Sequence, residues 1–358
     1  MSVKGTGSSA TYSMASGLDF SASVRRMLGA AVMVHCFLLV AGAFAQQDPA
    51  LKIREEVSLV TLTATVTDQQ GQHIAGLKKE DFKVYEDNTL QEIAVFESQE
   101  LPVSIGILFD TSGSMEDKLE DVKDAVKHFA DTVNPRDDIF LIRFASDVDL
   151  VLDSTDDRKR LYRAVDRLEA QGSTSLYEAV AEALARIRYG KHSKKAILII
   201  TDGKDTDSRI SLDEALTLAR RSEVLVYALG IGHSGSAPGW FLGGILGGHG
   251  HRAKGVYGGE DDVDRNVLDA LAVVTGGRSY YIEEAHSKGV DRIDIACEEV
   301  SAELRRQYLL GYYPANKAKD GNYRSIRLET RDPNYIVRSR KGYYAPVAQT
   351  GLRSQNPQ

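Results

Sequence analysis

The stretch VSIGILFDTSGS, residues 103–114, decides the fold of this chain. Its first seven residues carry no charge and are mostly apolar, which is typical of a β-strand buried on both faces. Asp110 ends this run, and the hydroxyls of Ser112 and Ser114 follow at alternate positions. Ligand crevices of α/β sheets lie at the carboxyl ends of the strands. We therefore expect this stretch to be the first strand of an α/β domain and to carry part of its binding site.

Strand and helix patterns alternate through residues 101–285, which we assign to one domain. Apolar runs predict strands at residues 103–109, 139–144, 196–201, 224–230 and 279–282, and helical periodicity predicts helices at residues 119–133, 157–170, 176–189, 212–221 and 263–275. Residues 148–152 follow a strand closely enough to be its hairpin partner. The predicted fold class is α/β, with a doubly wound, mostly parallel sheet and one antiparallel edge strand.

The segments that flank this domain, residues 51–98 and 307–346, show only strand patterns. Each holds about three strands, too few for a stable sheet of its own. We therefore expect them to combine into one smaller, discontinuous β-sandwich-like domain, into which the α/β domain is inserted. A helix at 286–306 precedes the second segment, one strand is expected over 335–344, and residues 347–358 form a flexible tail. The alternating Arg338, Arg340 and Lys341 are expected on a solvated face.

Residues 1–45 have the features of a secretory signal peptide. Arg25 and Arg26 precede an apolar run that ends in Ala43-Phe44-Ala45, a small-x-small exit. We predict cleavage after Ala45 and export to the periplasm, the cell surface or the medium. The alternative is an uncleaved anchor helix, because 19 apolar residues are about enough to cross a bilayer. Contact with a membrane is expected only in that case.

Composition excludes several functional classes. The 358 residues carry a formal net charge of −7, whereas nucleic-acid binders usually present a basic face. Two cysteines, Cys36 and Cys297, are too few for a disulfide scaffold or a cysteine-rich zinc site. Cys297 lies on an apolar helical face and is expected to be a buried thiol.

Oxygen-bearing side chains gather at two further element ends, Gly172-Ser173-Thr174-Ser175 and Thr201-Asp202-Gly203. Oxygen donors suit a hard cation, Mg²⁺ first, with Mn²⁺ or Ca²⁺ as alternatives. Together with residues 110–114, these clusters resemble the metal-ion-dependent adhesion site (MIDAS) of the von Willebrand factor type A (VWA) domain, written D-x-S-x-S, then T, then D. The five positions are filled by Asp110, Ser112, Ser114, Thr174 and Asp202. The flanking β segments also resemble a bacterial, secreted family of VWA-related proteins.

The resemblance implies a binding module and no enzyme activity. In such sites the hydroxyls bind the cation directly, the aspartates act partly through water, and one position is completed by a carboxylate from a protein or peptide partner. A helix that starts near Ser114 would also favour an anion at its N-terminus. We therefore expect an exported module for metal-dependent protein binding or cell adhesion, with no nucleic-acid partner.

Other interpretations of the same residues stay open at this point. A hydrolase could use the metal to activate water, although no His or Glu is placed by a motif as its general base. Alternatively, the metal could only hold the fold together. Ser114 with Asp117 could form a helix capping box, residues 172–174 an N-cap, and Asp202-Gly203 a turn. His233, His249 and His251, in the glycine-rich segment 233–259, are expected to be exposed, with transition-metal binding as the alternative.

Overall fold

The structure is a computed structural model that describes residues 59–233, 263–284 and 289–347. The chain divides into two units, residues 1–56 and 57–358, and all the described residues belong to the second. The predicted signal segment, most of the glycine-rich segment with His249 and His251, and the C-terminal tail lie outside the described residues. Within the described part, no helix is both long and apolar enough to span a membrane.

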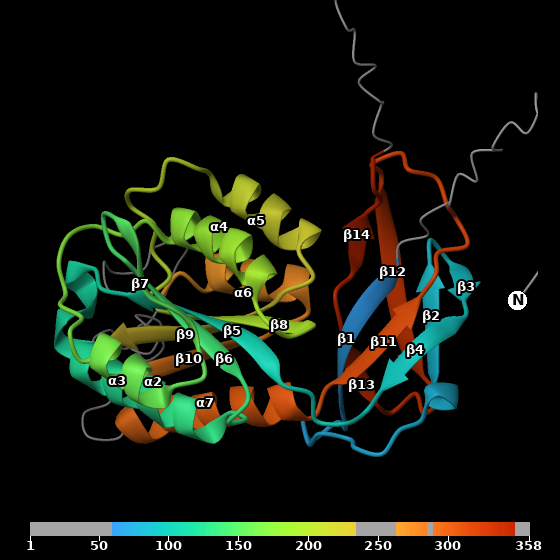
Figure 1. Ribbon diagram of the computed structural model, residues 1–358, viewed down its shortest axis with the longest axis horizontal. Coiled ribbons are helices and arrows are strands. Elements are labelled where there is room, and N and C mark those ends of the chain that lie inside the picture. Colours follow the sequence, from blue (N-terminus) through green and yellow to red (C-terminus); the bar gives the residue numbers. More distant parts are fainter. Residues whose placement is uncertain (1–58, 234–262, 285–288, 348–358) are drawn as a thin grey trace, which may run out of the picture. The chain divides into compact units, whose positions relative to one another are not determined.

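Six strands of the described chain form the central sheet, in the order β10-β9-β8-β5-β6-β7 (Figure 1). The strand of this sheet that comes first along the chain, β5, is buried throughout because it lies between two parallel neighbours, β6 and β8. Only β7 runs antiparallel, at one edge beside β6. The strands span Val103–Asp110 (β5), Asp138–Phe144 (β6), Val148–Thr155 (β7), Lys194–Thr201 (β8), Leu225–His233 (β9) and Ser279–Glu284 (β10). The predicted fold class is confirmed.

Helices cover both faces of this sheet. Apolar side chains of α2, α3 and α7 pack in one core on one face, and those of α4, α5 and α6 pack in a second core on the other. The helices span Leu119–Thr132 (α2), Arg158–Val165 (α3), Leu176–Arg186 (α4), Leu212–Arg221 (α5), Arg265–Thr275 (α6) and Gly289–Arg305 (α7). Cys297 of α7 is a fully buried free thiol, as expected, and burial raises the pKa of this thiol above its ordinary value.

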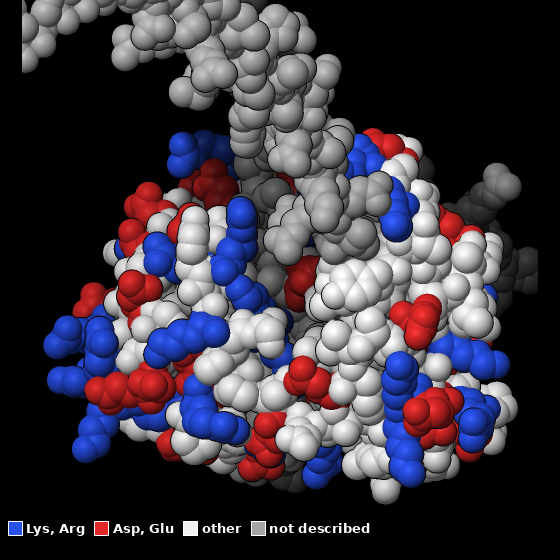
Figure 2. Space-filling view, turned by 45° about the vertical axis from the view of Figure 1, so that its right-hand side comes forward, with Lys and Arg blue, Asp and Glu red and all other residues white. Residues whose placement is uncertain are grey.

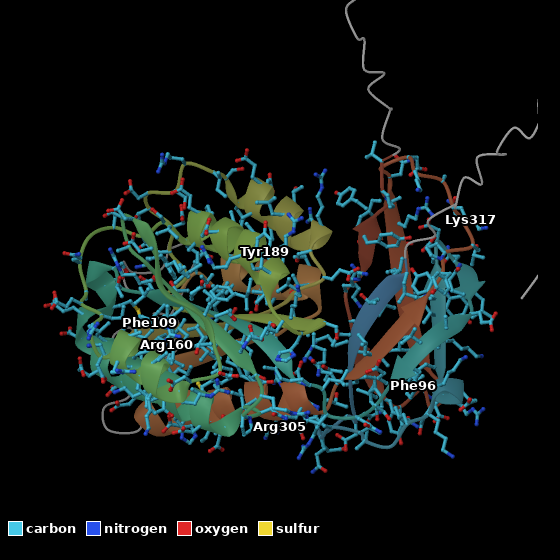
Figure 3. All side chains as sticks on the ribbon, viewed as in Figure 1. Phe96, Phe109, Arg160, Tyr189, Arg305 and Lys317 are labelled. Atoms are coloured by element: carbon cyan, nitrogen blue, oxygen red, sulfur yellow. The ribbon has the colours of Figure 1, made fainter. Side chains whose placement is uncertain are left out.

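The remaining strands form two antiparallel sheets, ordered β13-β1-β11-β4 and β14-β12-β2-β3. Each sheet mixes strands from before and after the central sheet, and apolar side chains of both sheets share one core. The strands span Val60–Thr67 (β1), Phe82–Glu86 (β2), Thr89–Gln91 (β3), Ile93–Glu97 (β4), Tyr308–Tyr312 (β11), Tyr323–Thr330 (β12), Ile336–Arg338 (β13) and Gly342–Tyr344 (β14). In Figure 3, Phe96 lies in this β part and Phe109 in the α/β part.

The prediction of one strand over residues 335–344 is wrong, and the predicted solvated face holds for the exposed Lys341 but not for Arg340, which is buried, while Arg338 is half-buried. The segment breaks after Arg338, so that β13 pairs with β1 and β14 pairs with β12 in the other sheet. Arg340, 7% exposed, lies at the break and donates to the Thr61 carbonyl oxygen at 2.6 Å and to Glu223 at 3.0 Å. The Thr61 carbonyl and the Glu223 carboxylate hold Arg340 in this buried position, which alternation along a strand does not reveal.

One buried carboxylate connects the α/β part with the β part. Glu303 of α7, 2% exposed, accepts hydrogen bonds from the Tyr227 hydroxyl of β9 at 2.6 Å and from the Thr65 hydroxyl of β1 at 2.9 Å. Arg338 of β13 pairs with the same carboxylate.

On the face shown in Figure 2, Lys and Arg are interspersed with Asp and Glu. This face therefore differs from the basic surface that nucleic-acid binders present.

Candidate functional site

The candidate site begins at Asp110, the last residue of β5. The backbone register places Asp110 beside Phe144 of β6, and Phe109 beside Ile200 of β8, so Thr201 lies next to Asp110 across the sheet. The Asp110 side chain is fully buried. It thus sits between two strands at their carboxyl ends, where the alternation of strand and helix predicts the ligand crevice.

Neutral groups satisfy the two carboxylate oxygens of Asp110. The Ser112 backbone N–H donates to Oδ1 at 2.8 Å, and the Thr201 hydroxyl donates to Oδ2 at 2.5 Å. The hydroxyls of Ser112 and Ser114 lie 3.1 Å apart. Three predicted site residues, Asp110, Ser112 and Ser114, are therefore brought together, with Ser112 buried and Ser114 exposed.

The loop before α4 lies against this first loop. Gln171 N–H donates to the Thr111 carbonyl at 2.7 Å, and Gly113 N–H donates to the Gly172 carbonyl at 3.0 Å. Gly172 has φ +81°, and a Cβ here would also come within 2.5 Å of Ser146 Oγ, so a glycine is needed. Thr174 follows two residues later and is 4% exposed.

The loop after β8 carries Asp202 and is hydrogen-bonded to Thr174. Thr206 makes two hydrogen bonds with Thr174. Its N–H donates to the Thr174 carbonyl at 2.9 Å, and its hydroxyl accepts from the Thr174 N–H at 2.9 Å. Asp202, 3% exposed, accepts from the Lys204 N–H at 3.1 Å through Oδ1. Its charge acts on Asp110, since it raises the pKa of that carboxyl. Asp110 thus lies at the end of β5, and the other four predicted residues lie on three segments, after β5, before α4 and after β8, that are hydrogen-bonded to one another.

The electrostatics of the site favour a cation. Burial raises the pKa of Asp110 to about 6, the bonds from Ser112 and Thr201 lower it in part, and the charge of Asp202 raises it further. A buried carboxylate with only neutral donors is destabilised in its charged form. A divalent cation between Asp110 and Asp202 would remove that penalty, and hydroxyl and carboxylate oxygens are the donors that Mg²⁺ accepts. The residues present therefore fit the metal that the MIDAS pattern implies.

Two of the alternative interpretations are not realised. Ser112, and not Ser114, is the N-cap residue, its hydroxyl makes no capping bond, and the element that follows is a 3₁₀ helix at Gly113–Lys118 (η2). A helical segment therefore does begin next to Ser114, but as a 3₁₀ helix, and the α-helix α2 starts at Leu119, where the helical periodicity predicts it. Likewise Ser175, rather than a residue of 172–174, is the N-cap of α4, again without a side-chain bond. These hydroxyls are not used as helix caps.

Sequence reasoning missed Thr201 as a member of the site. Its hydroxyl donates to Asp110 Oδ2 and also accepts from the Gly203 N–H at 3.0 Å. Its position could have indicated this role, because Thr201 ends an apolar strand that pairs with the strand ending in Asp110. Across the described residues, no three His, Cys, Asp or Glu side chains form a metal cluster. The candidate site combines two carboxylates with hydroxyls instead.

Comparison with known proteins agrees with this geometry. Residues 104–241 match the model of the von Willebrand factor type A domain. The chain contains a VWA domain. VWA domains are generally interaction modules, and they often bind a divalent cation at a MIDAS. The match to the family model ends within the segment that precedes α6, so the family model does not cover the β part.

Each of the similar proteins matches only part of this chain. An uncharacterized protein of Borreliella burgdorferi is 28% identical over 140 residues, 36% of this chain and 41% of that protein. The human von Willebrand factor A domain-containing protein 3A is 30% identical over 40% of this chain and 12% of its own length. A solved VWA structure from Catenulispora acidiphila, 15% identical, covers 75% of this chain and 74% of its own with a TM-score of 0.44. The chain thus spans less than half the length of these curated relatives.

Proposed function

We propose that this VWA protein is an exported binding module that captures a protein or peptide partner through one divalent cation. The cation, Mg²⁺ first and Mn²⁺ or Ca²⁺ as alternatives, would be held by Asp110, Ser112, Ser114, Thr174 and Asp202. The observation that carries the proposal is the buried carboxylate of Asp110, whose hydrogen-bond donors are all neutral. Such a group is stabilised when a cation balances its charge.

The donor set also indicates what the site does with a partner. When bound, the metal supplies a Lewis-acidic position for one further oxygen. Ser112, Ser114 and Thr174 would offer neutral oxygens that leave the cation electrophilic, while Asp110 and Asp202 would balance its charge partly through water. An anionic oxygen, such as the carboxylate of a partner's Asp or Glu, is therefore the preferred external ligand. Because Ser114 is exposed whereas Asp110 and Ser112 are buried, a partner would approach from the side of Ser114.

Titration calorimetry with MgCl₂ tests the metal part of the proposal. The wild-type protein should bind one Mg²⁺ per chain, and Asp110→Ala should bind none, since the variant lacks the central acidic ligand. Asp213→Ala is the matched control, because Asp213 is an exposed carboxylate in the first turn of α5. Equal Mg²⁺ affinity in wild type and Asp110→Ala would contradict the site.

The same samples separate binding from the two alternative functions. For a binding module, a pull-down from an extract should lose the partner when EDTA is added, while circular dichroism shows the fold unchanged. Unfolding on chelation would mean that the metal only supports the fold. Mg²⁺-dependent turnover of a panel of esters or phosphates, abolished in Asp110→Ala, would mean that the site is hydrolytic.

Export is the remaining part of the proposal and rests on the sequence of residues 1–45. The mature protein should begin at Gln46, and its N-terminal glutamine is expected partly in the cyclised form. Mass spectrometry of the protein from the exported fraction measures both forms. Recovery of an intact segment 25–45 in the membrane fraction would support the anchor instead.

A further inference from the structure

A pocket of about 210 Å³ is lined in part by Gln171, which belongs to the loop before α4 that also carries Thr174. It lies between the segment that follows α3 and the edge strands β6 and β7, on the sheet face covered by α2, α3 and α7. Apolar side chains form one part of its lining and charged or polar ones the rest: Val151 and Leu168, then Arg143, Arg167, Glu169 and Gln171. The pocket is smaller than most cofactor sites, which measure roughly 300–1,000 Å³.

The pocket shares a wall with the metal-site loops. Gln171, which lines it, donates its backbone N–H to Thr111, the residue directly after Asp110. Arg143 of β6 lies directly opposite Phe109 of β5, the residue that precedes Asp110. Thr174 is three residues beyond Gln171, so the chain between them spans at most about 10 Å. A ligand that reaches the metal is therefore within a few residues of the pocket.

The charged lining suits one anionic group. Arg143 already forms an ion pair with Asp149. Arg167 is exposed, and among the described residues no ion pair involves it. Its planar guanidinium matches a carboxylate with two parallel hydrogen bonds. Glu169 lies on the same lining and offsets part of the positive charge, so the pocket favours a single acid over a strongly acidic segment.

We propose that the partner of this site carries two acidic residues: one binds the metal, and the second places its side chain in this pocket against Arg167. This inference rests on the proposed metal-dependent binding. The aliphatic part of a Glu or Asp side chain would contact Leu168 and Val151, while its carboxylate meets the guanidinium. An extended peptide rises about 3.3 Å per residue, so a span of about 10 Å places the two acids about three residues apart.

A selection of short peptides displayed on phage tests this inference. The library carries one fixed Asp within otherwise random positions, and it is selected on the purified full chain in MgCl₂ and, separately, in EDTA. Selection is repeated on Arg167→Glu and on Arg160→Glu. Arg160 is the matched control, because it is an exposed arginine of α3 that does not line the pocket (Figure 3).

Wild type and Arg160→Glu should enrich a second acid near the fixed Asp in MgCl₂ only. Arg167→Glu should lose this preference and favour Lys or Arg at that position, and it should bind the wild-type peptides about tenfold more weakly. Mg²⁺-dependent peptides without a second acid, or the same acidic preference in Arg167→Glu, would overturn this inference alone. Absence of any Mg²⁺-dependent peptide would overturn the proposed function as well. Acidic peptides that bind equally in EDTA would show a pocket independent of the metal and overturn the two-acid arrangement.

Discussion

Thr65 of β1 donates a hydrogen bond of 2.9 Å to Glu303 of α7, although 238 residues separate the two positions. The same carboxylate accepts from Tyr227 of the central sheet and pairs with Arg338 of β13. One buried acid therefore serves both the α/β part and the β part. Its charge is balanced by an arginine from the far end of the chain, so neither part satisfies it alone.

Loss of Glu303 should destabilise the protein strongly. Glu303→Ala leaves the buried Tyr227 hydroxyl without its acceptor and Arg338 without its counter-charge, a change that typically lowers the free energy of unfolding by about 3–5 kcal/mol. Urea unfolding measures the effect. Glu299→Ala is the control. Glu299 is about half exposed and its ion pair with Arg278 is long, at 3.8 Å, so its loss should lower the free energy of unfolding by less than about 1 kcal/mol. Equal effects would show that Glu303 contributes no more than a surface acid.

Asp110→Asn should stabilise the metal-free protein at neutral pH. The folded state keeps a proton on Asp110 up to about pH 6, whereas the unfolded chain loses it near the ordinary value of 3.8. Between these two pH values the folded state binds more protons, so stability falls as the pH rises and stays low above pH 6. The uncharged amide avoids this loss, which amounts to about 3 kcal/mol at most. Urea unfolding in EDTA at pH 7 would contradict the argument if the variant were less stable.

Magnesium affinity should depend on pH through the same carboxylate. The cation and the proton compete for Asp110, whose pKa is about 6. Binding should therefore be independent of pH above about pH 7 and should weaken by up to tenfold for each pH unit below 6. Calorimetry between pH 5 and pH 8 checks this profile. A flat profile would mean that Asp110 is not a ligand.

Thr201→Val should shift the midpoint of this profile of Mg²⁺ affinity to a higher pH. The Thr201 hydroxyl lowers the pKa of Asp110 by its hydrogen bond, so its loss should raise that pKa further and weaken Mg²⁺ binding at pH 7. Thr201→Ser keeps the hydroxyl and should behave like wild type. A weakened affinity without a shifted pH midpoint would indicate a packing effect instead, because Thr201 is fully buried.

Removal of residues 307–358 should expose residues 60–97 to protease. Strands β1 and β2 lose their pairing with β11 and β12, and the remaining strands cannot close the shared core. Limited proteolysis with mass spectrometry locates the cuts. Deletion of residues 348–358 alone is the control and should leave these strands protected, because every described strand lies before residue 348. Continued protection after the longer deletion would show that the first four strands fold without their partners.

Local patterns predicted the central sheet well because its strands are continuous apolar runs and its helices have one apolar stripe. Asp110, Ser112 and Ser114 could be placed together because alternate positions at a strand end point in one direction. The positions of Thr174 and Asp202 depended on a family resemblance, since their loops are far apart in sequence.

The remaining features depend on contacts across the chain. The buried position of Arg340 depends on Glu223, 117 residues away, and the half-buried position of Arg338 depends on Glu303. The alternation of these arginines is the same in an exposed strand and in one whose arginines pair with acids from distant parts of the chain. The role of Thr201 likewise follows from strand order, which the sequence of β8 alone does not specify.

The bond between Lys194 and the end of α7 has a consequence for the order of folding. Lys194 starts β8 beside Val103, the first residue of β5, and its ammonium donates to the Leu304 carbonyl at 2.6 Å. Both ends of the inserted domain thus meet at one lysine. A chain in which β1 must find β11 across the whole insertion would pay a large loop-closure entropy and fold slowly. Once the insertion has folded, β1–β4 and β11–β14 are tethered through a short effective loop, so the interrupted sandwich can close at the speed of a continuous one.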